Sequence, residues 1–186
     1  MSRIIAGKFK GRRLEVPSGV AIRPTTDRMR ERVFSILMHG TYPDMNGART
    51  ADLFAGTGAL GLEALSRGAA HVTFVEKAPS SVACIKANIE TVKAAGDTDI
   101  LQKDACHLPA VPAPYDFIFM DPPYNKGLVN PALDSLCENG WLAPDGVIIC
   151  ELARDDTLSL PLDLELIDER SQGAQRTVFL SLSSKE

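Results

Sequence analysis

Short apolar runs alternate with segments of helical periodicity along most of the chain. Runs of strand length, typical of strands buried on both faces of a parallel sheet, occupy residues 50–54, 71–75, 98–102, 117–120 and 147–151. Between these runs, a helical pattern covers residues 62–67, 80–95 and 128–139. Strands that alternate with helices predict an α/β fold with a mostly parallel sheet.

The amino-terminal segment follows a different pattern. Ile4-Ile5 and Leu14-Glu15-Val16 flank a stretch that contains two glycines, which predicts a short β-hairpin. We therefore expect a hairpin arm over residues 1–22 and a single larger domain over residues 23–186.

Two further elements begin and end the larger domain. A helix is expected after Thr26, its predicted N-cap, with Met29 on its apolar face and Arg32 on its solvent side. At the other end, residues 162–170 and 176–182 read as two strands joined by a short polar loop.

Composition is that of one globular enzyme domain. The 186 residues are 45% hydrophobic, enough to bury one full core. No run approaches the length of a membrane span, and the amino terminus lacks an apolar secretory core, so we expect a cytoplasmic protein. The four cysteines and three histidines are dispersed without metal-ligand spacing, so no metal site is expected.

Charge is unevenly distributed. The net charge is −4, yet residues 1–32 carry nine basic and three acidic groups, which makes this segment +6 and the remainder −10. A basic arm on an acidic body is typical of phosphate binding, although an ordinary solvated face would have the same composition. Phe9 within the arm could stack on a base or pack on the protein. The candidate contacts to nucleic acid are Lys8, Lys10, Arg12, Arg13 and Arg28.

A glycine-rich turn follows the strand at 50–54. The segment Ala55-Gly56-Thr57-Gly58-Ala59-Leu60-Gly61 joins a strand to a helix, and glycines there let the backbone approach a ligand at the helix amino terminus. Glu76 ends the next apolar run, where a carboxylate can accept hydrogen bonds from ribose hydroxyls. The dinucleotide sites of nicotinamide enzymes have the same spacing, so this turn alone does not identify the cofactor.

The tetrapeptide Asp121-Pro122-Pro123-Tyr124 lies at the carboxyl end of the strand at 117–120, where open α/β sheets bind ligands. Asp121 can accept the protons of an amine, Pro122 offers a carbonyl, and Tyr124 offers a π-face for a planar base. These groups suit a nucleobase amine. The alternative is a proline-stiffened turn with a surface tyrosine.

The two motifs occur in this order on successive strands, which favours an S-adenosylmethionine-dependent methyltransferase over a dehydrogenase. A nicotinamide site would leave the tetrapeptide without a role. Asp104-Ala105, just after the strand at 98–102, adds a carboxylate for the adenine amine and an N–H for its ring, or else forms a simple polar turn.

Four segments resemble the RsmD family of 16S ribosomal RNA guanine-N2 methyltransferases. They are residues 3–12 (RIIAGKFKGR), 23–31 (RPTTDRMRE), 52–68 (DLFAGTGALGLEALSRG) and 121–124 (DPPY). The resemblance covers nearly the whole chain and implies a class I, Rossmann-like methyltransferase domain whose seven-stranded sheet ends in an antiparallel hairpin. Tyr124 stands where phenylalanine also occurs in the family, so an aromatic ring is retained.

The resemblance completes the candidate site, since it places the Arg-Pro-Thr-Thr stretch beside the methionine end of the cofactor. The expected cofactor-binding residues are Thr25, Thr26, Asp52, Phe54, Ala55, Gly56, Gly58, Leu60, Glu76, Lys77, Asp104, Ala105 and Asp121. The expected catalytic residues are Asp121, Pro122, Pro123 and Tyr124. Guanine N2 in 16S ribosomal RNA is the implied methyl acceptor, either as RNA alone or within an assembling small subunit.

Three alternatives remain at the level of sequence. One is an adenine-N6, cytosine-N4 or glutamine-amide methyltransferase, which needs the same carbonyl and carboxyl groups. The second is a nicotinamide-dependent oxidoreductase. The third is a non-catalytic RNA-binding module with a relic cofactor pocket, which the intact Asp121 and Tyr124 disfavour. A monomer is the default oligomeric state.

Overall fold

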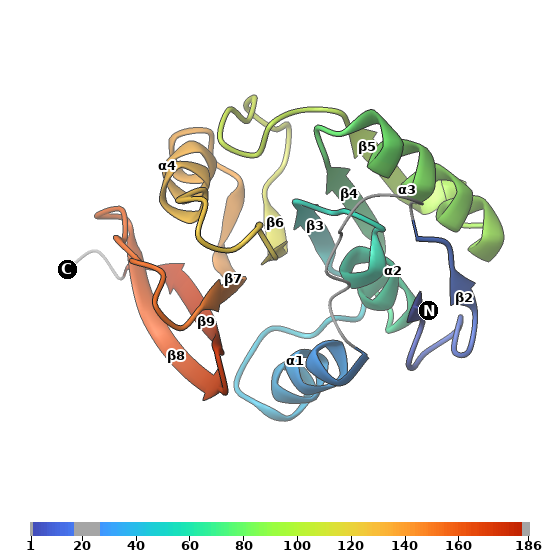
Figure 1. Cartoon of the computed structure of the whole chain (residues 1–186), viewed down its shortest axis with the longest axis horizontal. Coiled ribbons are helices and arrows are strands. Elements are labelled where there is room, and N and C mark those ends of the chain that lie inside the picture. The colour runs from blue at the N-terminus through green and yellow to red at the C-terminus, as the bar shows by residue number, and fades with distance from the viewer. Residues whose placement is uncertain (1, 17–26, 184–186) are drawn as a thin grey trace.

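A seven-stranded sheet with the order β5-β4-β3-β6-β7-β9-β8 lies at the centre of the molecule (Figure 1). The structure is a computed structural model that describes residues 2–16 and 27–183. Strands β3 to β7 are mutually parallel, and β9 lies antiparallel between β7 and β8. The expected α/β fold, with a mostly parallel sheet and an antiparallel closing strand, is confirmed. The strands of the sheet are β3 Arg49–Leu53, β4 His71–Val75, β5 Thr98–Leu101, β6 Tyr115–Met120, β7 Leu142–Ala153, β8 Leu164–Gln172 and β9 Gln175–Leu182.

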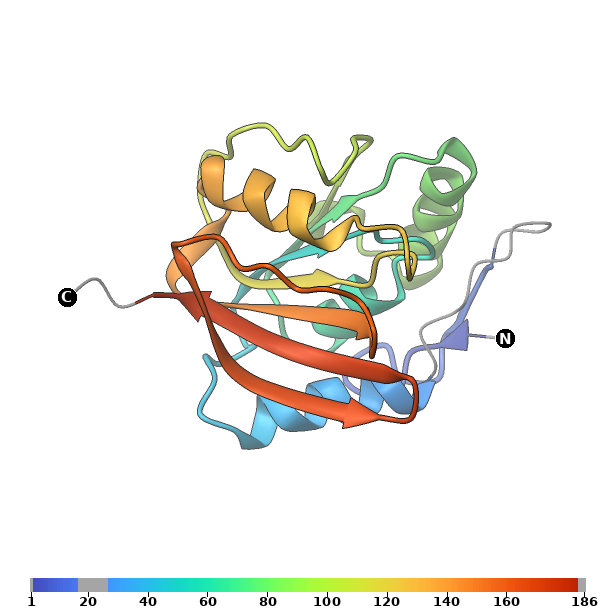
Figure 2. The same cartoon turned by 60° about the vertical axis from the view of Figure 1, so that its left-hand side comes forward.

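Helices cover both faces of this sheet (Figure 2). On one face, residues of α1, α2 and α3 share a core cluster with Phe117 and Phe119 of β6. On the other face, residues of α4 and Trp141 pack against Ile118 and Met120. Because alternate residues of β6 are buried on opposite faces, the strand is apolar throughout. The helices are α1 Asp27–His39, α2 Ala59–Ser66, α3 Pro79–Val92, the short 3-10 helix Ala95–Asp97 and α4 Val129–Glu138.

Helix α1 differs from its prediction at one position. Arg32 was expected on the solvent side, but it is half-buried because its guanidinium donates to Thr177 of β9, at 3.0 Å, and to Gln172 of β8. The expected N-cap, Thr26, lies outside the described residues. Within the described part of the chain, no helix is long and apolar enough to cross a membrane.

Strand β7 is longer than the sequence predicts. It begins at Leu142 rather than Val147, because Leu142 pairs with Tyr115 before a register shift in β6. The Pro-Asp-Gly segment at 144–146 is typical of a turn, so the sequence pattern predicts that the strand begins only after it. The irregular register accommodates these residues within the sheet.

The amino-terminal hairpin is present as β1 Ser2–Arg3 and β2 Arg13–Leu14, which pair antiparallel. Its apolar residues Ile4 and Leu14 belong to the core cluster shared by α1, α2 and α3. The arm is therefore packed on the larger domain. Whether the domain boundary lies at residue 22 stays a prediction, since residues 17–26 lie outside the described part of the chain.

The end of α2 anchors the arm through a dense set of hydrogen bonds. The buried Glu63 carboxylate accepts from the N–H groups of Ile5 (2.8 Å) and Ala6 (3.0 Å), and Ser66 O accepts from the N–H of Lys8 at 2.8 Å. Gly7 has φ +80°, and a Cβ at this position would lie 1.8 Å from Ser66 O. The arm can approach α2 this closely only because residue 7 is glycine.

Candidate active site

The carboxyl ends of four neighbouring parallel strands bring most of the predicted site residues to one edge of the sheet. In sheet order, Asp104 follows β5, Glu76 follows β4, Phe54 follows β3 and Asp121 follows β6. Leu53 and Met120 are direct partners in the β3–β6 ladder, so the glycine turn and the Asp-Pro-Pro-Tyr motif begin side by side. The strand connections change direction between β3 and β6, where α/β sheets bind ligands.

The glycine turn after β3 has three residues in the left-handed region of backbone space. These are Phe54 with φ 58°, Gly56 with φ 56° and Gly58 with φ 77°. A left-handed conformation is strained for Phe54, and such strain concentrates at ligand sites. Helix α2 begins directly after Gly58, three residues earlier than the sequence pattern predicts at residue 62. Gly61 is required for a different reason: it lets α2 pack closely on β4, since a Cβ at this position would lie 2.4 Å from the Phe74 ring.

Asp52 lies beneath this turn. It is 1% exposed, and its Oδ2 accepts a hydrogen bond from the Gly61 N–H at 2.8 Å. Burial raises the pKa of Asp52 well above its usual range; the Gly61 bond opposes this, and the carboxylates of Asp121 and Glu76 add to it. The observed contact of Asp52 is with the turn itself, and its contact with a cofactor stays a prediction. Ala55 and Leu60 are likewise buried parts of the turn.

Glu76 joins the end of β4 to the same turn. Its carboxylate accepts from the Gly56 N–H at 2.9 Å and from the Ala78 N–H at 2.8 Å, and the side chain remains partly exposed. A carboxylate has about four lone-pair positions, so two remain for hydroxyl donors. Glu76 is therefore held in place and still able to accept from a ribose.

Asp104 forms the second polar group of this half of the site. It accepts from the Cys106 N–H at 3.0 Å and pairs with Lys77 Nζ at 3.1 Å. The Cys106 hydrogen bond and the Lys77 charge lower the pKa of Asp104, which keeps the carboxylate ionised at neutral pH. Ala105, the other predicted contact here, is buried.

The glycine turn, Glu76 and Asp104 suit S-adenosylmethionine better than a nicotinamide dinucleotide. A pyrophosphate would need the backbone N–H groups of the glycine turn. Here the N–H groups of Gly56, Gly58 and Gly61 already donate to Glu76, to the Ala55 carbonyl and to Asp52. The carboxylate of Glu76, which bonds the Gly56 N–H, would also repel a phosphate. S-adenosylmethionine carries no phosphate, and its ribose and adenine amine need acceptors such as Glu76 and Asp104.

The Asp-Pro-Pro-Tyr motif follows β6, which lies on the opposite side of β3 from β4, so the glycine turn stands between this motif and Glu76. Asp121 and Tyr124 are partly exposed, and Gln175 Nε2, at the start of β9, donates to the Tyr124 hydroxyl at 2.7 Å. This hydrogen bond fixes the Tyr124 hydroxyl, and the sequence pattern does not predict it because the two residues are far apart in the chain.

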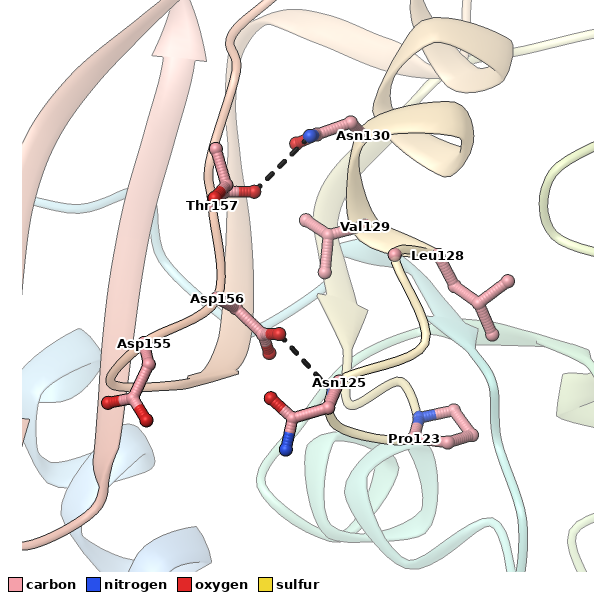
Figure 3. Close-up of a pocket in the computed structure, with 9 residues that line it drawn as sticks. Pro123, Asn125, Leu128, Val129, Asn130, Asp155, Asp156 and Thr157 are labelled. Atoms are coloured by element: carbon pink, nitrogen blue, oxygen red, sulfur yellow. Dashed lines mark hydrogen bonds between the residues drawn. The ribbon is translucent and has the colours of Figure 1, made fainter.

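A cavity of about 380 Å³ opens beside this motif (Figure 3). Pro123, Asn125 and Asp155 are among its lining residues, and the side chains of Asn125 and Asp155 lie on either side of it. Asp156 Oδ1 accepts from the Asn125 N–H at 3.3 Å, which ties the loop after β6 to the loop after β7. The cavity lined by Pro123 and Asn125 is therefore a hollow between two joined loops.

The predicted nucleic-acid contacts are all exposed. Lys8, Lys10, Arg12 and Arg13 project from the arm, and Arg28 from α1. Phe9 is half-buried against the core, and Lys8 Nζ lies 4.9 Å from its ring centroid, so packing is its observed role.

The Asn88 side chain connects the arm to the glycine turn. Asn88 of α3 accepts from the Glu15 N–H at 2.7 Å through Oδ1 and donates to the Thr57 carbonyl at 2.9 Å through Nδ2. The arm and the glycine turn therefore share a buried anchor. No cluster of three metal-ligating side chains occurs among residues 2–16 and 27–183, and Thr25 and Thr26 lie outside that part of the chain.

The sheet, the glycine turn after β3 and the Asp-Pro-Pro-Tyr motif after β6 are those of a class I methyltransferase. The chain belongs to the family described as Conserved hypothetical protein 95, the RsmD family, which it matches over residues 2–181. It is accordingly a methyltransferase.

Individual relatives agree with this assignment. The chain is 37% identical to ribosomal RNA small subunit methyltransferase D of Haemophilus influenzae, with 92% of this chain and 89% of that protein covered. It is 38% identical to the protein of the same name in Escherichia coli K12, over 92% and 85%. A solved structure described as the putative methyltransferase yhhF from Escherichia coli matches with a TM-score of 0.83, 34% identity and 99% coverage of both chains.

Replacing Glu76 with alanine is expected to weaken S-adenosylmethionine binding by about 1.5–3 kcal/mol, because a charged acceptor for the ribose is lost. Isothermal titration calorimetry measures the change. Glu76→Gln is the matched control, since it keeps the side-chain size and one oxygen acceptor while removing the charge, and its loss should be smaller. Binding of NADH without binding of S-adenosylmethionine by the unmodified protein would contradict the cofactor assignment.

Proposed function

We propose that this methyltransferase transfers a methyl group from S-adenosylmethionine to the exocyclic N2 amine of a guanine in 16S ribosomal RNA. The observation that carries the proposal is the register of β3 and β6. Leu53 and Met120, the last residues of these strands, are direct partners, so the glycine turn and the Asp-Pro-Pro-Tyr motif that follow them begin side by side. Cofactor groups and amine-binding groups then meet at one edge of the sheet.

On the cofactor side, Glu76 and Asp104 would hold the ribose and the adenine, with Lys77 keeping Asp104 in place. When bound, S-adenosylmethionine supplies a methyl group on an electrophilic sulfonium. The residues of the chain align the acceptor amine with that methyl group, and alignment alone contributes a large part of the rate in such reactions.

On the substrate side, the Asp121 carboxylate and the Pro122 carbonyl would each accept one N–H of the amine. A free aspartate has a pKa near 3.9 and is too weak a base to deprotonate a neutral amine. Its role is to orient the nitrogen so that its lone pair faces the methyl group. Tyr124 would stack on the extruded base, which contributes roughly 1–3 kcal/mol in comparable sites.

Two observations support ribosomal RNA as the substrate class. The relatives in Haemophilus influenzae and Escherichia coli are named as methyltransferases of small-subunit ribosomal RNA. In addition, residues 1–32 carry a charge of +6 within a chain of net charge −4, and the exposed cations of the arm can contact phosphates. The proposed location of the protein is the cytoplasm, because bacterial ribosomal RNA is made and assembled there.

The test is methylation in vitro followed by nucleoside mass spectrometry. Unmodified 16S ribosomal RNA and small subunits assembled from it are incubated separately with the protein and isotopically labelled S-adenosylmethionine. Label in N2-methylguanosine is expected, and the better of the two substrates shows whether RNA alone or an assembling subunit is used. Label in N6-methyladenosine, in N4-methylcytidine or in ribosomal protein would contradict the proposed acceptor.

A further inference from the structure

Glu151, in the carboxyl-terminal half of β7, is an unusual residue for the interior of a sheet. It is 2% exposed. Its Oε1 accepts a hydrogen bond from the Thr177 hydroxyl, while its Oε2 has no hydrogen-bond partner within the described part of the chain. A buried carboxylate oxygen without a partner destabilises a folded protein. The folding of the sheet therefore does not explain why this position holds a glutamate.

The register of the sheet places Glu151 beside Asp121. Met120 of β6 and Cys150 of β7 are parallel partners and pack in the core cluster on the α4 side of the sheet. Glu151 is the next residue of β7, and Asp121 directly follows β6, which ends at Met120. Because side chains alternate between faces along a strand, Glu151 points to the opposite side, toward α1, and the charge of Asp121 acts on it from the neighbouring strand end. Two carboxylates thus stand close together, one on β7 and one at the end of β6.

The remaining groups around Glu151 come from β9 and α1. Thr177 pairs with Glu151 across the antiparallel β7–β9 ladder, and its hydroxyl also accepts from the Arg32 guanidinium at 3.0 Å. Among residues 2–16 and 27–183, the charged groups that act on Glu151 are Asp121, just after β6, and Arg32 from α1. The pKa of Glu151 is raised to about 7, chiefly by burial; the Thr177 hydrogen bond and the Arg32 charge oppose this rise, and the Asp121 charge adds to it.

We propose that Glu151 is a positioning residue for methyl transfer that acts through Asp121: as a second carboxylate beside it, Glu151 makes Asp121 a stronger acceptor for the amine proton. This inference rests on the proposed function. Two neighbouring carboxylates with different environments commonly divide such roles, since the charge of one raises the proton affinity of the other.

The atoms and charges of the step balance. The bond between the methyl carbon and sulfur breaks, and its electron pair stays on sulfur. The guanine N2 lone pair forms the new bond to carbon, which leaves the nitrogen positively charged. One N–H bond then breaks with its electrons retained by nitrogen, and the proton moves to an Asp121 oxygen and from there to water. Glu151 exchanges no atom with the substrate.

The test compares Glu151→Gln with the unmodified protein in single-turnover methylation at saturating S-adenosylmethionine, from about pH 6 to about pH 9. Glutamine keeps the shape and the acceptor for Thr177 but removes the charge. The unmodified protein is expected to gain rate as Glu151 ionises near pH 7. In the variant this rise should disappear, and the rate at the alkaline end should fall by about tenfold or more, with cofactor affinity unchanged.

Two further variants complete the test. Glu165→Gln, an amide change at an exposed carboxylate on β8, is the matched control and should leave the profile unchanged. Glu151→Asp retains the charge and should retain the rise with pH, which also decides the outcome if Glu151→Gln does not fold. A Glu151→Gln profile that superimposes on that of the active unmodified protein, or a Glu151→Asp profile without the rise, overturns the inference. Absence of methylation by the unmodified protein overturns the proposed function instead.

Discussion

Asp121→Ala is expected to slow single-turnover methyl transfer by about 10²-fold or more, because the amine loses the acceptor that orients it. The side chain is partly exposed at the end of β6, so the variant should fold. Binding of S-adenosylmethionine should change much less than the rate, since Glu76 and Asp104 lie on other strands. Rapid-quench kinetics with labelled cofactor measures the rate, and calorimetry measures the binding.

The Asp121→Asn variant sharpens this prediction. Asparagine keeps one oxygen acceptor of the same length but has no charge, so its loss should be smaller than that of alanine if orientation dominates. If the rate depended mainly on proton uptake by the carboxylate, asparagine and alanine would be equally slow. A rate for Asp121→Ala equal to that of the unmodified protein would remove Asp121 from the mechanism.

The parts of the fold that could be predicted are those fixed by local pattern. The apolar run 117–120 is buried on both faces of the sheet, and this is why it identifies a parallel strand. The glycines at 56 and 58 likewise have a local cause, a left-handed backbone, whereas Gly61 is required by close packing on Phe74 of β4. Periodicity and turn chemistry contain this information.

The parts that escaped prediction depend on contacts between distant segments. Glu63 reads as a polar helix residue, yet it is fully buried as the acceptor for the backbone of the arm. Gly7 reads as a hairpin residue, yet its main constraint comes from Ser66. Glu151 ends an apolar run like any strand-terminal residue, and only the β6–β7 register places it beside Asp121.

The arm is expected to supply most of the salt dependence of RNA binding. Lys8, Lys10, Arg12 and Arg13 are exposed on a hairpin whose N–H groups donate to the Glu63 carboxylate of α2, so the backbone that carries them is fixed to the domain. If each contacts a phosphate of single-stranded RNA, replacing all four with alanine should flatten the plot of log affinity against log salt by about 0.7 per contact. Because phosphate contacts are independent of sequence, the loss should be similar for all RNAs tested.

The measurement is a salt titration of RNA affinity for the unmodified protein and the quadruple variant, with S-adenosylmethionine affinity measured in parallel. Cofactor affinity should scarcely change, because none of the four side chains lies at the carboxyl edge of the sheet. A control with Lys86, Lys103 and Arg154 replaced by alanine removes three exposed charges outside the arm and should alter the slope much less per charge. Equal slopes for the unmodified protein and the quadruple variant would mean that the arm only packs on α2, and that the RNA surface lies near Tyr124, Asn125 and Lys126.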